Sequence, residues 1–469
     1  MRRRWLAEPC WLVKILNSVT PPNLVTVDIG QILGEIARTM KIQPFFVIGG
    51  LLIAAFMFTE ARIWANVNGS DWPGWRGADQ SNISPDTGLL KSWPEGGPKL
   101  LWTYENAGNG YSSHAVVDGK LYTLGARHSR ELLICLDAKT GAEIWTAEVE
   151  QDPEDGYRTN WGTGPRSTPT VSDGHVYALG VAGDIVCISA DEGKRVWSRN
   201  LVNDFGGEVS KWGYSESPTV DGDKVLVTPG GSKGAIVALD KKTGTTIWQS
   251  KDLTDLAEYS SVVIADVDGR RQYVQFFMKT LAGVDAESGD LLWTSDWSQG
   301  RTAVVPTPIY RDGHVFVTSG YNAGAKLVNI NGTNSEVVWQ NNEMINHHGG
   351  VVLVSGHVYG FSDQKKGNLM CLNFMTGEVA WMERVDRELT KGSVHAADGM
   401  LYCMNENGGW VYLVEASPRG FNEKGKFKLP KETSLREGTR GRIWSHPVVI
   451  SGKLYLRDQD LIFCYNVKE

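Results

Sequence analysis

Short apolar segments separated by turn residues recur along the chain from residue 99 to its end. In one unit, residues 167–171, 175–179 and 184–188 are rich in Val, Ile, Leu and Tyr, and Asp173-Gly174 and Ala182-Gly183 lie between them. Such Gly-containing pairs are typical of tight hairpins. A fourth apolar segment with a tryptophan follows, and no helical period interrupts the units. The pattern predicts four antiparallel strands per unit.

The tryptophans of these units are almost evenly spaced, with gaps of 43, 52, 51, 45, 46 and 42 residues. A period of this size indicates a repeat architecture, and four-stranded units arranged around a ring form a β-propeller. We interpret the repeat tryptophans as structural. They are Trp102, Trp145, Trp197, Trp248, Trp293, Trp339 and Trp381.

A turn of the form Asp-x-x-x-Gly precedes several of these tryptophans, as in residues 137–141, 240–244 and 285–289. Asp or Asn can bond its own backbone in such a turn, and Gly supplies a positive φ. The fifth unit departs from the pattern, because it keeps Asn331 but has Ser335 where Gly is expected.

The number of blades follows from the two ends of the repeat. Six units close at a tryptophan and a seventh closes near Phe427. Three further strands follow, around residues 444–450, 453–457 and 461–465, and residues 99–104 form an orphan strand. We therefore predict an all-β, eight-bladed propeller of four-stranded antiparallel blades, in which N- and C-terminal strands share one blade. Seven blades is the alternative, if the segment after Trp410 does not form a complete unit.

The turn-plus-Trp pattern resembles the repeat of quinoprotein-like propellers, which are named for pyrroloquinoline quinone. The resemblance covers roughly residues 99–469. It includes exported, planctomycete-type propellers and the propellers that assist outer-membrane protein assembly. The resemblance implies the fold; the family holds both dehydrogenases and proteins that bind no quinone.

The cysteines occupy a repeated position rather than a disulfide framework. Cys135, Cys187 and Cys371 each lie ten residues before a repeat tryptophan, and Cys464 lies in the matching segment of the last unit. We expect a tight position opposite the tryptophan, where Cys acts as a small hydrophobe. Equivalent positions in different blades should be too far apart to form a disulfide.

The N-terminal 65 residues predict export. Residues 44–58 form an uninterrupted apolar run of 15, shorter than the ~20 that a membrane span needs. Read from Met40, with Lys41 before the run and small residues up to Ala65, residues 40–65 have the layout of a signal peptide. Residues 1–39 then form an upstream extension from a mis-assigned start. A retained membrane anchor is the alternative, and would be the chain's sole link to a membrane.

Residues 66–98 form a leader rich in Trp, Pro and Gly that carries no period. We expect it to pack on the ring, which occupies residues 99–469, with Trp72, Trp75 and Trp93 as anchors. The formal net charge is −7, and no basic stripe appears, which argues against a nucleic-acid partner.

Candidate functional residues are those just before each unit's first strand, because these positions shape one mouth of the central channel. They mix aromatic groups with both signs of charge, as at the rim of a binding site, although many could serve only as hydrated links between blades. Of the adjacent histidines His347 and His348, at most one should face the channel if the segment is extended. The predicted binding residues are Trp161, Arg166, Trp212, Tyr214, Glu258, Arg301, His348, Lys391, Arg442 and Trp444.

The same residues offer no complete catalytic set. The family resemblance implies an adjacent Cys-Cys pair, a calcium set and a catalytic Asp for a quinone-dependent dehydrogenase, and this sequence has no Cys-Cys pair and no Cys-x-x-Cys-His haem motif. Glu216 and Glu258 are a candidate calcium pair, with partnership to Arg166 or Arg301 as the favoured interpretation.

We therefore expect no catalytic residues, no metal and no cofactor, and disfavour pyrroloquinoline quinone with calcium. The favoured hypothesis is a non-catalytic scaffold in the periplasm or cell envelope that binds an envelope protein or a polar ligand at the channel mouth. The alternative is a quinone-dependent oxidoreductase that acts on an alcohol or sugar.

Overall fold

The computed structural model describes residues 69, 71–151, 156–297, 299–362, 367–383, 391–436 and 441–469. The chain divides into two units, residues 1–66 and 67–469, and the described residues all belong to the second. The predicted upstream extension, the signal peptide and Cys10 lie outside the described residues. Within the described ranges, no helix has the length and apolar character needed to cross a membrane.

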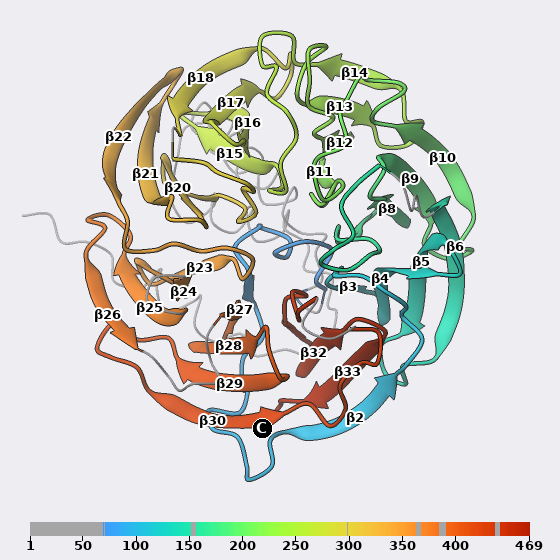
Figure 1. Ribbon diagram of the computed structural model, residues 1–469, viewed down its shortest axis with the longest axis vertical. Coiled ribbons are helices and arrows are strands. Elements are labelled where there is room, and N and C mark those ends of the chain that lie inside the picture. Colours follow the sequence, from blue (N-terminus) through green and yellow to red (C-terminus); the bar gives the residue numbers. More distant parts are fainter. Residues whose placement is uncertain are drawn as a thin grey trace, which may run out of the picture. The chain divides into compact units, whose positions relative to one another are not determined.

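The described chain forms eight antiparallel four-stranded sheets arranged as blades around a ring, which confirms the predicted eight-bladed propeller (Figure 1). Each blade runs from an inner strand at the channel to an outer strand at the rim. The inner strands are β3 (Ala115–Val117), β7 (Thr170–Ser172), β11 (Thr219–Asp221), β15 (Val263–Val267), β19 (Ile309–Arg311), β23 (Val351–Val354), β27 (Gly392–Ala397) and β31 (Val448–Ile450). The outer strands are β6 (Glu143–Gln151), β10 (Arg195–Asn200), β14 (Thr246–Gln249), β18 (Leu291–Asp296), β22 (Asn334–Asn341), β26 (Val379–Glu383), β30 (Glu423–Lys428) and β2 (Lys99–Tyr104).

The two middle strands of each blade carry most of the apolar core, because both of their faces are covered by neighbouring blades. The second strands are β4 (Lys120–Arg127), β8 (His175–Leu179), β12 (Lys224–Val227), β16 (Arg270–Phe276), β20 (His314–Ser319), β24 (His357–Ser362), β28 (Met400–Asn405) and β32 (Lys453–Asp458). The third strands are β5 (Arg130–Asp137), β9 (Asp184–Ser189), β13 (Val237–Asp240), β17 (Thr280–Asp285), β21 (Gly324–Asn331), β25 (Asn368–Asn373), β29 (Trp410–Glu415) and β33 (Leu461–Asn466).

The ring closes through a blade that the two ends of the repeat share. Strand β2 pairs with β33 in the order β2-β33-β32-β31, and Figure 1 shows the blue and red ends of the chain side by side there. Trp102 of β2 lies opposite Cys464 of β33. The orphan strand of the sequence is therefore the missing fourth strand of the eighth blade.

In five blades the small residue ten positions before the tryptophan is its cross-strand partner, whereas Trp339 lies opposite Leu327. Cys135 pairs with Trp145 and Cys187 with Trp197, while Ala238 and Gly283 take the same position in other blades. The five described cysteines are all free and buried. Cys thus fills a tight space beside the indole ring.

Each repeat tryptophan also packs onto the next blade's turn. A Cβ built on Gly141, Gly193, Gly244, Gly289 or Gly377 would lie 2.5–2.8 Å from the indole of the preceding blade's tryptophan. Only Gly fits, since these positions also have positive φ. The Asp-x-x-x-Gly turn therefore joins neighbouring blades as well as neighbouring strands.

The irregular fifth unit shows what happens when that glycine is missing. Trp293 precedes the turn that carries Ser335, and its indole Nε1 donates to Gln272 Oε1 at 2.7 Å within its own blade. Five other repeat tryptophans instead donate to a backbone carbonyl of the next blade, as Trp248 does to Ala286 O at 3.2 Å.

The described part of the leader contacts the ring at several places along its length. Residues 71–84 enter the middle of the ring, where β1 (Ile83–Ser84) pairs in parallel with β27. Trp93 is 7% exposed and packs edge-on against Phe427, the residue that replaces tryptophan in the seventh blade. Gly97 of the leader also lies against Phe427, as the turn glycines do against tryptophan elsewhere.

Candidate functional site

A belt of hydroxyl groups joins neighbouring blades just before their inner strands. The backbone N–H of Ser113 donates to Thr168 Oγ1 at 3.1 Å, and that of Thr168 to Ser217 Oγ at 2.9 Å. Ser217 N–H donates to Ser261 Oγ and Ser261 N–H to Thr307 Oγ1, at 2.9 and 3.3 Å. The belt fixes five consecutive blades around the channel and sets the positions of the loops above it.

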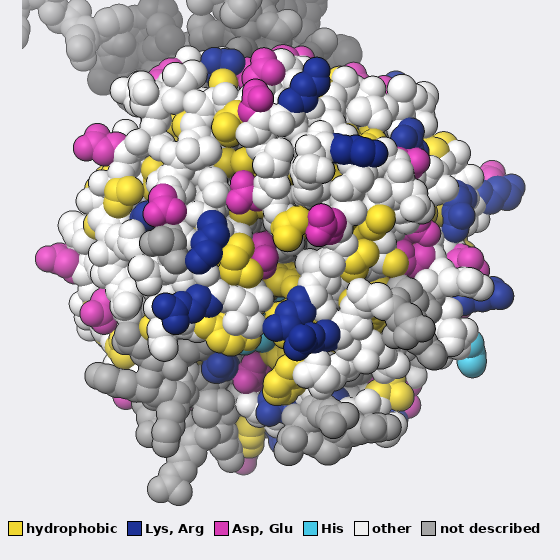
Figure 2. Space-filling model, turned by 45° about the horizontal axis from the view of Figure 1, so that its top comes forward, with side chains coloured by type: hydrophobic (Ala, Val, Ile, Leu, Met, Phe, Trp, Pro, Cys, Tyr) yellow, Lys and Arg dark blue, Asp and Glu magenta, His cyan; other side chains and the backbone are white. Residues whose placement is uncertain are grey.

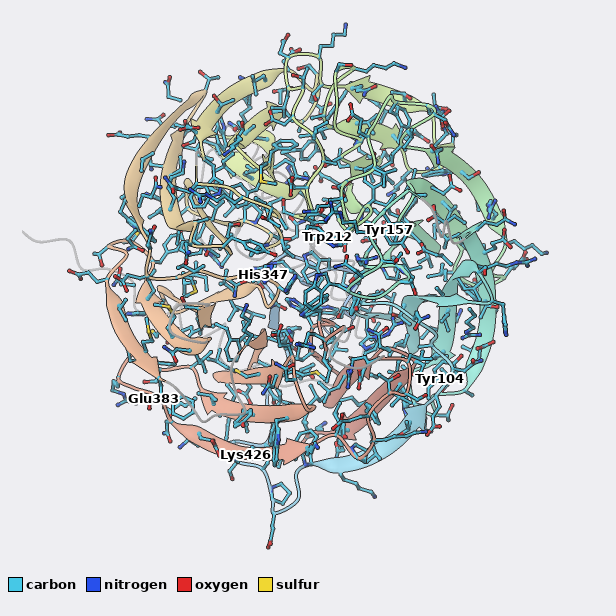
Figure 3. All side chains as sticks on the ribbon, in the orientation of Figure 1. Tyr104, Tyr157, Trp212, His347, Glu383 and Lys426 are labelled. Carbon is cyan, nitrogen blue, oxygen red and sulfur yellow. The ribbon has the colours of Figure 1, made fainter. Side chains whose placement is uncertain are left out.

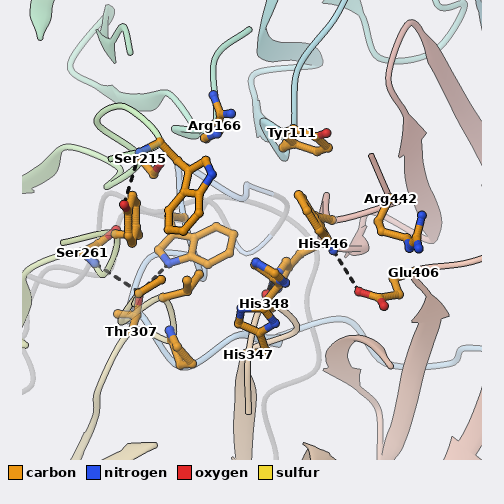
Figure 4. Close-up of a pocket in the computed structure, with 18 of the residues that line it drawn as sticks. Tyr111, Arg166, Ser215, Ser261, Thr307, His347, His348, Glu406, Arg442 and His446 are labelled. Carbon is orange, nitrogen blue, oxygen red and sulfur yellow. Dashed lines mark hydrogen bonds between the residues drawn. The ribbon is translucent and has the colours of Figure 1, made fainter. Parts of the chain in front are cut away.

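These loops and the leader enclose a cavity of about 380 Å³ at one mouth of the channel. Figure 3 places Trp212, Tyr157 and His347 near the centre of the ring, whereas Tyr104, Glu383 and Lys426 lie at its rim. Figure 4 shows lining side chains that come from several blades and surround the pocket. The volume suits a small molecule or a few side chains of a partner.

Aromatic rings form one continuous wall of this cavity. Tyr321 meets His347 edge-on with ring centroids 4.6 Å apart, and His347 lies 3.6 Å from His348. His348 stacks on Trp444 at 4.2 Å, and Trp444 in turn lies 5.0 Å from Tyr111. Four separate loops thus contribute to a largely apolar wall whose rings are tilted against one another.

Positive charge dominates the lining. Among the described lining residues, the cationic side chains are Arg76, Arg166, Lys391 and Arg442, and the carboxylate is that of Glu406. Glu406 Oε2 accepts a hydrogen bond from Trp444 Nε1 at 2.9 Å. Figure 2 shows a face of the molecule on which Lys and Arg side chains stand near the centre together with hydrophobic, Asp and Glu side chains. The cavity therefore favours a ligand with negative charge.

Arg166 is held in place by backbone and aromatic groups. Its guanidinium donates to Gly164 O at 2.8 Å and Gly162 O at 3.0 Å. The same group lies over the rings of Tyr111 and Tyr157, at 5.6 and 5.3 Å from their centroids. This arrangement stabilises the cation by cation–π attraction.

The structure brings most of the predicted binding residues together. Trp161, Arg166, Trp212, His348, Lys391, Arg442 and Trp444 line the cavity. Three others do not. Tyr214 is 1% exposed and donates to Pro229 O at 2.9 Å, Glu258 accepts the N–H of Val304 at 3.1 Å, and Arg301 is exposed outside the lining.

Both adjacent histidines line the cavity, contrary to the expectation that at most one would. The expectation assumed an extended segment, but His347 and His348 precede β23 in a loop, so the alternation of a strand does not apply. Burial lowers the pKa of His347 to about 3 and the pKa of His348 well below its usual range. Both rings are therefore neutral at pH 7 and act as aromatic surface.

Sequence reasoning missed the leader residues Trp75 and Arg76, together with Glu406 and His446. Glu406 follows a strand instead of preceding one, so the rule that selected candidates passed over it. The leader carries no period from which its position could be inferred. Ser217, Ser261 and Thr307 recur at one repeat position, a signal that was present in the sequence.

The two glutamates considered as a calcium pair serve other roles. Glu216 is 2% exposed, and its carboxyl accepts the backbone N–H of Thr228 and lies 3.4 Å from Gln275 Nε2. In the described ranges neither Glu216 nor Glu258 pairs with Arg166 or Arg301. Burial raises the pKa of Glu216 to about 8 and that of Glu258 to about 7.

We expect Glu216 to make the stability of the ring depend on pH. The folded state keeps the Glu216 proton up to about pH 8, whereas the unfolded chain loses it near pH 4.3. Unfolding between these values therefore releases a proton, so the free energy of unfolding falls as pH rises, by about 1.4 kcal/mol per pH unit. Glu216→Gln should remove this contribution.

Denaturant unfolding of the wild type and Glu216→Gln from pH 5 to 8 measures the effect. The difference between the two proteins cancels the buried histidines, whose lowered pKa values act in the opposite direction. A difference that does not change with pH would show that Glu216 is ionised in the folded protein.

The family model described as outer membrane protein assembly factor BamB matches residues 129–383. The chain belongs to this family of PQQ-repeat propellers. The match begins within the first blade and ends in the sixth, so it covers repeat units and not the leader.

Two kinds of curated relative are similar to this chain. BamB of Burkholderia pseudomallei is 24% identical over 346 residues, which cover 66% of this chain and 86% of the relative. A 1-butanol dehydrogenase (cytochrome c) of Thauera butanivorans is 28% identical over 196 residues, which cover 40% of this chain and 26% of the relative. This chain thus matches about a quarter of the dehydrogenase's length.

Solved structures of both kinds share the fold. BamB of Moraxella catarrhalis has a TM-score of 0.56 at 15% identity, covering 79% of this chain and 98% of that one. Quinohemoprotein alcohol dehydrogenase of Comamonas testosteroni has a TM-score of 0.52 at 15% identity, covering 87% and 82%. At these identities the likeness concerns the fold.

The expectation that the chain takes no cofactor needs correction. It set the dehydrogenase side of the family aside, but relatives named 1-butanol dehydrogenase (cytochrome c) and lupanine 17-hydroxylase (cytochrome c) match this sequence, and quinohemoprotein structures share its fold. The error was to infer the absence of a cofactor from missing Cys-Cys and haem motifs. Those motifs concern catalysis and electron transfer, and they do not decide whether a cavity can hold a quinone.

The donor groups of the cavity fit one part of a quinone–calcium pair better than the other. Aromatic walls and cations suit a flat anion. Calcium prefers several oxygen ligands, and the described lining offers the carboxylate of Glu406, which is already bonded to Trp444. No group of three or more His, Cys, Asp or Glu able to hold a metal occurs in the described part of the chain.

Proposed function

We propose that this protein is an exported propeller of the cell envelope that binds a polar ligand, or polar side chains of an envelope protein, in the cavity at its channel mouth. The observation that carries the proposal is the lining itself. Aromatic rings from four loops and four cations surround a space of about 380 Å³. Aromatic and Arg side chains are the usual anchors of binding sites.

The similarity to BamB supports the envelope location and a protein partner. These relatives are named as outer membrane protein assembly factors, and the Burkholderia pseudomallei relative is matched over 86% of its length. We propose binding without catalysis, because the described lining residues combine cations and aromatic rings with a carboxylate engaged by Trp444.

A quinone-dependent oxidoreductase is the second candidate. The similarity to dehydrogenases and the aromatic, cationic lining favour it. In that case Arg166, Arg442 and the aromatic wall would hold the quinone. The quinone would itself accept the electrons when an alcohol or sugar is oxidised.

Combined replacement of Arg166 by Met and Trp212 by Leu should weaken partner binding at least about tenfold, because two interface anchors are lost. Crosslinking to envelope extract of the native host, with quantified capture, provides the measurement. Arg301→Met is the matched control, since Arg301 is exposed outside the lining. Equal capture by the double variant would contradict binding at the cavity.

A second assay separates the two candidates. Purified protein is incubated with pyrroloquinoline quinone and calcium, and reduction of a dye by alcohols and sugars is followed. Binding without catalysis predicts no dye reduction above the rate without protein. Stoichiometric uptake of the quinone with turnover would replace the binding proposal by the oxidoreductase.

A further inference from the structure

Residues 71–84 of the leader reach the inner parts of all eight blades. The backbone of Trp72 bonds with Val116 of the first blade, and Pro73 O accepts the N–H of Val171 of the second. Side chains of the segment contact the remaining six blades. Gln80 contacts Thr219 of the third blade and Val262 of the fourth, and Trp75 contacts Thr307 of the fifth and His446 of the eighth. Arg76 contacts Val351 of the sixth blade, and Asn82 contacts Val394 of the seventh. No single blade positions this segment; the ring as a whole does.

The segment supplies the floor of the cavity through Trp75 and Arg76. Trp75 is half-buried, its Nε1 donates to Thr307 Oγ1 at 2.9 Å, and its ring lies edge-on to His446 at 4.6 Å. Thr307 ends the belt of hydroxyl groups. Trp75 is thus fixed to the ring at its edge while it lines the cavity.

Arg76 places a buried positive charge beside Trp75. The side chain is 3% exposed, and its Nε, Nη1 and Nη2 donate to the carbonyls of Gln80, Val351 and Ser81 at 2.9, 3.0 and 3.4 Å. A guanidinium has five N–H donors, so three of them are used. Among the described residues no carboxylate lies within 4.0 Å of this guanidinium.

The neutral carbonyl groups satisfy hydrogen bonds but do not cancel the charge. A buried cation without a counter-charge is costly. Asp79 is the carboxylate whose charge acts on Arg76, but its side chain is exposed to solvent and forms no ion pair with this guanidinium among the described residues. An anion in the cavity would provide the missing counter-charge.

We infer that the leader is part of the binding site, and that Trp75 and Arg76 determine its specificity for a small anion with a flat ring. The ring of the ligand packs on Trp75 and the aromatic wall, and one anionic group approaches Arg76 at the floor. Arg166 and Arg442 line other parts of the cavity and supply positive charge for a second anionic group. This inference rests on the proposed function, because it assumes that the cavity is the binding site.

Benzene-1,3,5-tricarboxylate is a suitable probe, and its neutral tricarboxamide and sodium sulfate test the need for charge and for a ring. Titrations are followed by tryptophan fluorescence and calorimetry. We expect the tricarboxylate to bind at least tenfold more tightly than either comparison compound, and to weaken as salt concentration rises.

Replacement of the floor residues tests the leader's part in the site. Trp75→Leu and Arg76→Gln should each weaken tricarboxylate binding about tenfold or more, and Arg76→Lys less. Lys91→Gln is the matched control, because Lys91 is a leader cation that pairs with Asp398 and does not line the cavity. Melting temperatures identify variants that fold, and Trp75→Leu provides the test even if Arg76→Gln does not fold, since Trp75 is half-buried.

The outcomes distinguish a failure of the leader's part in the site from a failure of the cavity as the binding site. If Arg166→Met weakens binding while Trp75→Leu and folded Arg76 variants bind as the wild type does, the floor is not part of the site and the inference fails, whereas the proposed cavity stands. If the wild type binds none of the probes, or binds the neutral amide equally well, the anionic ligand class is overturned. If the tricarboxylate binds but Arg166→Met has no effect, the cavity itself is not the site.

Discussion

Removal of residues 66–105 should abolish cooperative folding of the entire ring. The deletion removes β2, which is the fourth strand of the eighth blade, and the segment that contacts all eight blades. Without β2, the hydrogen-bonding edge of β33 is exposed and Trp102 leaves its position on Gly141 of the first blade. The eighth blade then lacks its outer strand, and its contact with the first blade through Trp102 is lost.

Three proteins compared by calorimetry and far-ultraviolet circular dichroism would test this expectation. Residues 66–469 should melt in one cooperative transition, and residues 106–469 should show none at 25 °C or above. Residues 85–469 retain β2 but lack the channel segment, so they separate closure of the ring from occupation of its middle. A chain of residues 106–469 with the same transition as 66–469 would show that closure through β2 is not required.

The blades and the closure of the ring could be predicted from local features of the sequence. Turn pairs such as Asp173-Gly174 and the spacing of the tryptophans are local signals, and they were sufficient for the blades, their number and the shared eighth blade. The position of Cys opposite Trp was also readable, since both belong to one repeat unit.

The path of the leader was not predictable in this way. Gln80 bonds with Val262 and Asn82 with Val394, which are 182 and 312 residues away along the chain. Such contacts depend on the assembled ring, and no period in residues 66–98 marks them. The floor of the cavity was missed for this reason, although the tryptophans of the leader were recognised as anchors.

The candidate site was predictable as a region but not residue by residue. The rule that inner-strand loops shape one mouth selected Trp161, Trp212 and Trp444, which line the cavity. The rule gives position along the chain and not the direction of a side chain. Tyr214 therefore turned out to be buried between strands, and Arg301 to be exposed outside the lining.

The repeat tryptophans connect the strands within a blade to the neighbouring blade, because each one is part of a strand pair and of a contact between blades. Trp248 is 8% exposed, lies opposite Ala238 in its own blade, and stacks on Tyr273 of the next blade with centroids 6.1 Å apart. Its Nε1 donates to Ala286 O at 3.2 Å, and its ring fills the space that Gly289 leaves open.

Trp248→Ala should therefore destabilise the ring by about 3–5 kcal/mol, the usual cost of truncating a large buried aromatic side chain. Chemical denaturation followed by circular dichroism gives the free energy of unfolding.

Gly289→Ala tests the same contact from the other blade, because its new Cβ would lie 2.5 Å from the indole of Trp248. Gly119→Ala is the matched control for the backbone, since Gly119 has a φ of 73° against 76° for Gly289 and has no atom within 4 Å of the added Cβ. Both glycine variants carry the cost of a positive φ, so the additional loss in Gly289→Ala, about 1–3 kcal/mol, reports the clash with Trp248. Equal stability of the two glycine variants, together with an unchanged Trp248→Ala protein, would show that the tryptophan does not join the blades.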